Sequence, residues 1–207
     1  MMDDPRGREA GTLALAVGIV AASSALSLAT FFAIHGPFGS INDVGNAATG
    51  VLSACLAWRL REGLTGRNRD VALGAALVGA AITVVGSALV VSGTTGFFLA
   101  GLVSSVGFAG IGAWLVALNR SVGTEGWSRR LRTLGVATGG LMALGIAAAP
   151  GIALRIDDMA TAPAWIWIGQ LAWLGVFVVY PAWAVWLGTA ERRASRRETN
   201  GTTMAVG

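Results

Sequence analysis

The polar side chains with the greatest chemical potential lie close together in one short stretch of the chain. His35 is followed by Asn42, Asp43 and Asn46. A carboxylate and an imidazole that lie close together can relay a proton or bind a polar head group. Asp43 and Asn46 are three residues apart, so they share one face of any helix that contains both. The pattern predicts a polar site formed by these four residues.

Helix capping explains most of the same residues without any ligand. Ser40, Asn42 and Asp43 stand where a helix is expected to begin, and such residues accept hydrogen bonds from the free amides of a first turn. A carboxylate there also suits the positive end of the helix dipole. Capping is the simpler interpretation, but it leaves Asn46 unexplained, because Asn46 lies too far along the helix to be a cap.

A second polar position is Gln170, which lies in the last long apolar segment. Trp165, Trp167 and Trp173 flank it, and Pro181 follows further along. Proline removes a backbone hydrogen bond and kinks a helix, so a kinked aromatic helix with one amide could line a cavity. The simpler interpretation is an aromatic belt at the membrane surface with an ordinary interhelical hydrogen bond.

Residues needed for most enzymatic and cofactor chemistry are missing from the sequence. Cys55 and His35 are each the only residue of their type. This excludes an intramolecular disulfide, a cysteine-based metal cluster and a haem held by two histidines of one chain. There is no His-Glu-x-x-His, Gly-x-Ser-x-Gly or phosphate-binding loop motif. We therefore expect no catalytic residues, no metal site, no cofactor and no enzymatic activity.

Long apolar segments must position these polar residues. Of the 207 residues, 54% are hydrophobic and only 13% are charged, whereas a soluble domain carries about a quarter charged residues. A helix needs about 20 apolar residues to cross a bilayer, and six segments meet this requirement: 11–34, 41–59, 71–92, 96–118, 131–149 and 164–188. Pro150 is expected to end the fifth. The sequence thus predicts an all-α polytopic membrane bundle of six transmembrane helices, arranged as three hairpins within residues 11–190.

Small residues recur at helical spacing within several of these segments. The fourth segment carries Gly101, Ser105, Ala109 and Gly112, and the first carries a run of hydroxyls from Ser23 to Thr30 that includes Ser27. Such stripes could form a polar pathway. The simpler interpretation is close helix packing, with hydroxyls bonded to carbonyls of their own helix. We expect the fourth helix to be central and closely packed.

The arginines are distributed unevenly among the connections between these segments. Two precede the first segment, and four lie in each of 59–70, 119–132 and 191–207, whereas the other connections hold only Arg155. Arginine-rich loops remain in the cytoplasm, so both termini are predicted to be cytoplasmic in a bacterial plasma membrane. Residues 1–10 then form a cytoplasmic N-terminus, and 191–207 form a basic cytoplasmic tail with a disordered end.

Two functions from different classes fit this pattern. The first is a non-enzymatic membrane module or subunit of a larger complex, since no arginine or glutamate lies in the middle of any span and pumps usually carry an ionisable residue at that depth. The second is a small transporter or ligand-binding protein with an outward-facing polar site near Asp43. The first predicts no deep cavity. The second predicts a cavity lined by Asp43, Asn46, Gln170 or the hydroxyl-bearing stripes.

The expected partners follow from the same features. The lipid bilayer surrounds the apolar segments, and the module interpretation adds another membrane protein or a second copy of this chain. No nucleic acid is expected, because the arginines that give the net charge of +4 flank the apolar segments and membrane orientation accounts for them.

Overall fold

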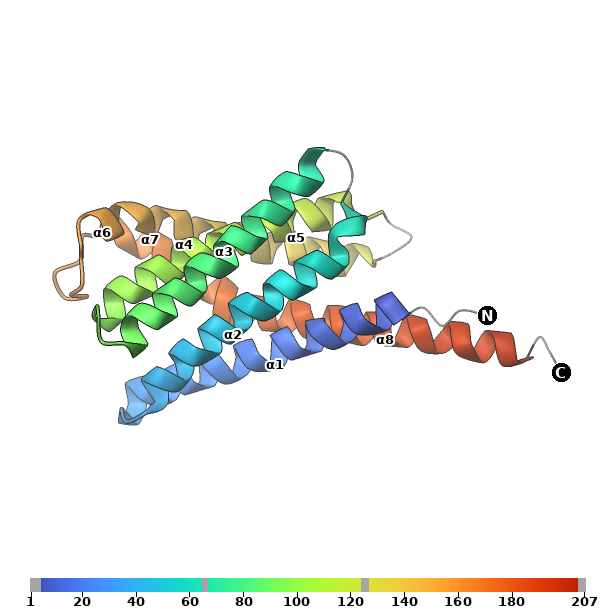
Figure 1. Cartoon of the computed structure of the whole chain (residues 1–207), viewed down its shortest axis with the longest axis horizontal. Helices are drawn as coiled ribbons and strands as arrows, with labels where there is room; N and C mark the ends of the chain where they lie inside the picture. Colours follow the sequence, from blue (N-terminus) through green and yellow to red (C-terminus); the bar gives the residue numbers. More distant parts are fainter. Residues whose placement is uncertain (1–4, 65–66, 124–126, 205–207) are drawn as a thin grey trace.

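The six predicted helices are present in the structure. A computed structural model of the chain describes residues 5–64, 67–123 and 127–204. All regular structure in these residues is helical, and the predicted all-α bundle is confirmed (Figure 1). The long helical stretches are α1 (Pro5–Ile34), α2 (Phe38–Arg59), α3 (Arg67–Val91), α4 (Phe97–Ser121), α5 (Arg129–Ala143) continuing to α6 (Ala149–Ala153), and α7 (Ile166–Leu174) continuing to α8 (Tyr180–Met204).

Five of these stretches are long and apolar enough to cross a membrane, and α2 is the exception. With 22 residues, α2 is about 33 Å long and could span the hydrocarbon core, but polar residues lower its hydropathy. It packs against α1 on one side and α3 on the other. Its polar face is therefore covered by protein, which is where polar side chains in a membrane bundle are tolerated.

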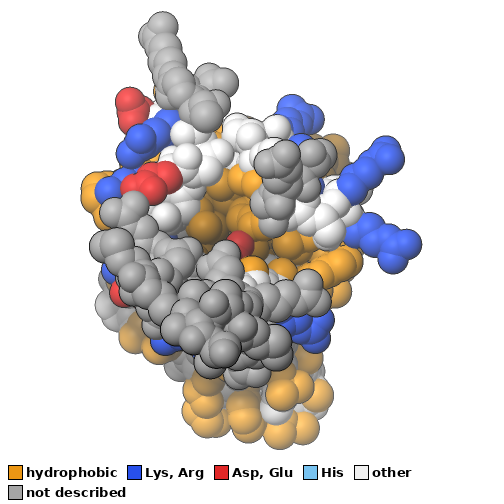
Figure 2. All heavy atoms as spheres, turned by 90° about the vertical axis from the view of Figure 1, so that its right-hand side faces the viewer, with side chains coloured by type: hydrophobic (Ala, Val, Ile, Leu, Met, Phe, Trp, Pro, Cys, Tyr) orange, Lys and Arg blue, Asp and Glu red, His pale blue; other side chains and the backbone are white. Residues whose placement is uncertain are grey.

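The two ends of the bundle differ in chemistry. The turn end holds the connections α1–α2, α3–α4 and α6–α7, and the terminal end holds the first and last described residues with the connections α2–α3 and α4–α5 (Figure 1). Figure 2 looks onto the terminal end, where arginine side chains lie around the rim and hydrophobic side chains fill the hollow between them. The uneven distribution of arginine in the sequence thus corresponds to one face of the bundle.

The first and last helices extend further than the apolar segments indicate. α1 already begins at Pro5, and α8 continues to Met204. The two helices pack side by side, and Arg192 Nη2 donates to Thr12 Oγ1 at 3.3 Å. The predicted disorder at the end of the tail stays a prediction, although the helix continues beyond the last apolar segment as far as Met204. Residues 205–207 lie outside the described part of the chain.

Pro150 does not end the fifth span. The helix tightens into a 3-10 turn at Leu144–Ala148 and then continues through α6 to Ala153. Pro150 stands in the first turn of α6, where a missing backbone N–H leaves no hydrogen bond unmade. The whole stretch from Arg129 is long and apolar enough to span a membrane.

Glycines bring α4 into backbone contact with α5. A Cβ atom added to Gly112 would lie 2.7 Å from the carbonyl oxygen of Gly139, and one added to Gly139 would lie 2.5 Å from the carbonyl oxygen of Gly112. On the other side of α4, a Cβ at Gly110 would lie 2.6 Å from the carbonyl oxygen of Ala75. α4 is also the most buried of the five spans. The predicted central position of the fourth helix is confirmed.

We predict that Gly139→Ala destabilises the protein, whereas Gly140→Ala does not. The two positions are neighbours in α5, so the substitution raises helix propensity equally at both. Only Gly139 has the α4 backbone within contact distance, since a Cβ at Gly140 meets nothing within 4 Å. Overpacking should lower the free energy of unfolding of Gly139→Ala by about 1–3 kcal/mol. Thermal unfolding in detergent measures this, and equal melting temperatures for the two variants would contradict the α4–α5 packing.

Candidate functional site

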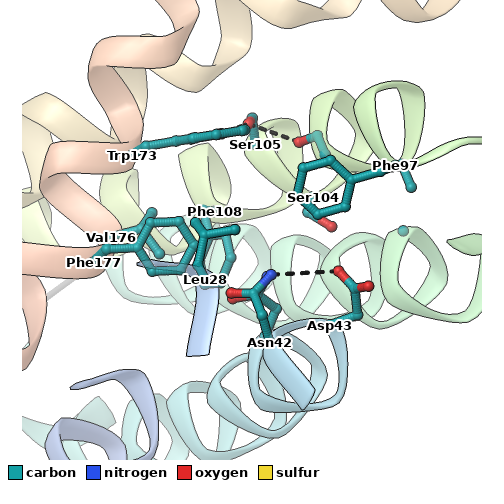
Figure 3. A pocket seen from close by; sticks show the side chains of 14 residues that line it. Leu28, Asn42, Asp43, Phe97, Ser104, Ser105, Phe108, Trp173, Val176 and Phe177 are labelled. Atoms are coloured by element: carbon teal, nitrogen blue, oxygen red, sulfur yellow. Dashed lines mark hydrogen bonds between the residues drawn. The ribbon is translucent and has the colours of Figure 1, made fainter. Parts of the chain in front are cut away.

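A small pocket lies near the turn end between α2, α4 and the last span (Figure 3). The centre of a water molecule can occupy about 30 Å³ of it, which is room for about two water molecules. Its polar lining comes from two helices: Asn42, Asp43 and Asn46 on α2, and Ser104 and Ser105 on α4. The remaining lining is mainly aliphatic and aromatic. The pocket therefore offers a few oxygen and amide groups in apolar surroundings.

Ser24 of α1 holds the two asparagines in place. Its hydroxyl lies 3.0 Å from the backbone oxygen of Asn42, 3.0 Å from Asn42 Oδ1 and 3.1 Å from Asn46 Oδ1. One hydroxyl donates a single proton, so these three acceptors share it. Gly45 allows the close approach, because a Cβ there would lie 2.8 Å from the Cβ of Ser24. The contact fixes α1 against the polar face of α2.

Asp43 is poorly satisfied by the protein around it. It is 8% exposed, and its one hydrogen bond among the described residues comes from Asn42 Nδ2 at 3.4 Å. No arginine or histidine lines the pocket. The carboxyl group points towards α4, from which Phe97 and Ser104 reach into the same space (Figure 3). A buried carboxylate without a cationic partner is unfavourable, so the charged form of Asp43 is destabilised unless a proton or a cation joins it.

The capping interpretation of these residues is wrong. α2 begins at Phe38, and Pro37 stands at its N-cap without a side-chain cap hydrogen bond. Asp43 is therefore the sixth residue of the helix, beyond the first four amides that need an acceptor. Asn42, Asp43 and Asn46 instead form the polar wall of the pocket, and their role as a functional site stays a prediction.

His35 does not join this wall. It follows α1 with a φ of 58°, a left-handed conformation that ends the helix. Its side chain is exposed, and its ring lies edge-on to Phe31 with the centroids 5.7 Å apart. The predicted pairing of this imidazole with Asp43 is not found, because the turn carries the ring outwards.

Gln170 also lies outside the pocket lining, and Trp173 takes its place. Gln170 Nε2 is buried without a hydrogen-bond partner in the described structure. Trp173, three residues further along α7, lines the pocket and donates from Nε1 to Ser105 Oγ at 3.0 Å. Ser105 in turn donates to the carbonyl oxygen of Gly101 at 2.8 Å. The last span thus contributes an aromatic wall to the pocket, and the side-chain amide of Gln170 is not part of the pocket lining.

The helix that carries Trp173 widens beside the pocket. Gly175–Val179 forms a π-helical turn, in which the Tyr180 N–H donates to the carbonyl oxygen of Gly175. Pro181 follows directly, and it has no N–H to continue the regular pattern. Wide turns of this kind recur at functional sites, and here Phe177 from the turn lines the pocket. The irregularity predicted from Pro181 therefore begins before the proline.

Three phenylalanines, which sequence reasoning did not single out, meet at the turn end beside the pocket. Phe97 lines the pocket and begins α4. Its ring centroid lies 5.9 Å from that of Phe31 and 6.4 Å from that of Phe32, both at the end of α1. The sequence could have indicated this contact. The three phenylalanines lie at ends of predicted spans on the same side of the membrane, where aromatic side chains can meet. Phe97 is the one of the three that lines the pocket, and it connects the pocket lining to the aromatic end of α1.

The buried polar face of α2 continues beyond the pocket. Asn42, Asn46, Thr49 and Ser53 recur at helical spacing and are all buried. Ser53 Oγ lies 2.8 Å from the hydroxyl of Tyr180, which is fully buried in the last span. From Asn42 to Ser53 this face covers about 16 Å of helix. The polar side chains therefore reach from the pocket well into the bundle.

No protein family model, curated protein or solved structure matches this chain. What the fold and the site define together is a helical membrane protein with a buried carboxyl group in a small polar pocket. Its function must be argued from that site, since a helical bundle supports many functions.

We predict that Ser24→Ala destabilises the α1–α2 contact and that Ser27→Ala is nearly neutral. Ser24 supplies the shared proton for Asn42 and Asn46, whereas Ser27 donates only to Ser23 of its own helix, at 3.0 Å. Losing an interhelical hydrogen bond in a membrane bundle costs about 0.6–1.7 kcal/mol. Thermal unfolding of both variants in detergent measures the difference, and identical melting temperatures would show that Ser24 does not join the helices.

Proposed function

We propose that this protein binds a proton or a small monovalent cation at Asp43. The observation that carries the proposal is a buried carboxyl group that faces a pocket and has one long hydrogen bond, from Asn42 at 3.4 Å. An ionisable residue inside a membrane bundle usually serves ion or proton binding. A proton or cation on Asp43 would remove the unpaired charge.

The size of the pocket supports a small ligand. Sites for drug-sized molecules have volumes of about 300 Å³ or more. Here the centre of a water molecule can occupy about 30 Å³, so a proton with bound water or a single dehydrated cation fits. A larger solute would require α1 and α2 to move away from α4.

The ligand groups support a monovalent cation over a transition metal. Asp43 contributes one negative charge and Ser104 a neutral hydroxyl, while the amide oxygens of Asn42 and Asn46, which already accept from Ser24, are neutral as well. Oxygen ligands favour hard cations, and one carboxylate balances a single positive charge. Among the described residues, no group of three or more His, Cys, Asp or Glu could hold a metal ion.

We further propose that the protein lies in a bacterial plasma membrane with both termini in the cytoplasm. The arginines around the terminal end support this orientation, because basic residues are retained on the cytoplasmic side (Figure 2). The turn end, and with it the pocket, then faces outwards.

Of the two functions considered from the sequence, the pocket favours the ligand-binding protein or transporter over a module without a site. The buried polar face from Asn42 to Ser53 is consistent with onward movement of the bound proton or cation.

We predict that Asp43 reacts with a hydrophobic carbodiimide, which modifies protonated carboxyl groups in apolar surroundings. Labelling of Asp43, measured by mass spectrometry on protein purified in detergent, should increase as the pH is lowered. If the ligand is Na⁺, adding Na⁺ at constant pH should reduce labelling and raise the melting temperature by mass action. If the ligand is a proton, labelling should follow pH alone.

Asp43→Asn is the matched control for this experiment. Asparagine keeps the shape of the side chain and removes the ionisable group, so the variant should fold with an unchanged or higher melting temperature. It should lose both the label and any effect of Na⁺ on stability. Failure of wild-type Asp43 to react at any pH, together with the absence of any stabilisation by Na⁺, would overturn the proposal.

A further inference from the structure

A second concave site lies at the terminal end and is independent of the Asp43 pocket. It is a groove between the end of α4 and the start of α5. Arg120 in the last turn of α4 lines it together with Arg129 and Arg132 of α5. Three guanidinium groups from two helices therefore line one groove, and none of the described residues that line it is acidic.

The start of α5 has an unusual electrostatic pattern. Acidic residues normally stabilise the first turn of a helix, because the amide end of the helix dipole is positive. α5 has none in its first turn and carries Arg129, Arg130 and Arg132 there or immediately after it. Among the described residues, none of these arginines forms an ion pair. An anion bound in the groove would offset both the helix dipole and the arginine charges.

The groove is held in shape by hydrogen bonds. Arg132 Nε donates to the backbone oxygen of Asn119 at 3.1 Å, which positions the guanidinium group beside the end of α4. Ser128 caps α5 by accepting from the Leu131 N–H at 3.3 Å. Arg132 is half-buried, while Arg120 and Arg129 are exposed. The planar fork of arginine suits two-point recognition of a phosphate group.

The surroundings of the groove favour a lipid as the source of that phosphate. Val136 and Ala137 also line it, and they belong to a stretch that is long and apolar enough to span a membrane. From Arg129 to Ala137 the helix rises about 12 Å. Over that distance the groove would extend from the depth of the lipid headgroups to the depth of the acyl chains. A headgroup phosphate could contact the arginines while its acyl chains follow the apolar surface of α5.

We propose that the groove formed by Arg120, Arg129, Arg132 and Thr133 binds the phosphate of an anionic phospholipid headgroup. The site lies at the opposite end of the bundle from Asp43 and uses different residues. The lipid-site proposal is therefore independent of the proposed cation site. The Asp43→Asn variant should bind the lipid as the wild type does.

Native mass spectrometry of the purified full chain tests this proposal. The protein in neutral detergent is mixed with phosphatidylglycerol or with phosphatidylcholine, and bound lipid is counted as a function of lipid concentration. The wild type should retain phosphatidylglycerol in preference to phosphatidylcholine. Arg129→Gln combined with Arg132→Gln should weaken phosphatidylglycerol binding on the order of tenfold, since each arginine near a membrane surface contributes to the attraction of anionic lipid.

Arg130→Gln provides a matched control, because it removes one charge next to Arg129 from a residue that does not line the groove. The single variant Arg129→Gln should weaken binding more than Arg130→Gln. If the two variants weaken it equally, diffuse charge explains the attraction and the groove proposal is wrong. Full displacement of phosphatidylglycerol by an equal concentration of inorganic phosphate would also overturn a lipid site and indicate one for free phosphate.

Arg132→Lys keeps the experiment decisive if the double variant does not fold. Lysine retains the charge but cannot make the two-point contact. The proposal expects weaker phosphatidylglycerol retention than in the wild type, with an unchanged melting temperature. Retention equal to the wild type would show that the fixed guanidinium group of Arg132 has no role.

Discussion

Polar groups inside a bilayer must find partners within the protein, and in this bundle that constraint acts most strongly on α2. The helix carries Asn42, Asp43 and Asn46 near the turn end and Ser53 further along. It therefore lies between α1 and α3 with its polar face covered. The hydroxyl of Ser24 satisfies the asparagines, and Tyr180 meets Ser53 from the last span. These few hydrogen bonds determine which faces of α1, α2 and α8 turn inwards.

Asp43 is the one ionisable side chain on this polar face, and the constraint is poorly met there. Its carboxyl group has one long bond to its neighbour and faces a pocket. A half-satisfied buried polar network is less stable than an apolar core, and the cost is greatest for an ionisable group. The unmet carboxyl, the small volume beside it and the wide turn at Gly175–Val179 occur together at one depth of the bundle. This coincidence is the physical argument for a site that binds a proton or a small cation.

Sequence reasoning predicted the six helices and the central position of α4, because apolar length and small-residue spacing are large signals. It also identified the polar residues of α2, but it left a helix cap and a polar site as alternatives for them. The predicted start of that helix was three residues late, at 41 instead of Phe38, and this shift changes Asp43 from a cap into an interior residue. Inward faces were harder to predict. In α1 the hydroxyls of Ser27 and Thr30 bond to their own helix, while Ser24 meets α2, and an apolar helix in lipid has little amphipathic contrast to distinguish them.

The most direct test of the account is the infrared difference spectrum of the purified protein between neutral and acidic buffer without Na⁺, recorded for the wild type and for Asp43→Asn. If Asp43 exchanges a proton in its pocket, the wild-type spectrum should contain a protonated-carboxyl stretching band that the variant lacks. Adding Na⁺ should remove that band if the cation occupies the same position. Superimposable spectra from the two proteins would contradict the central claim, because Asp43 would then take no part in proton or cation binding.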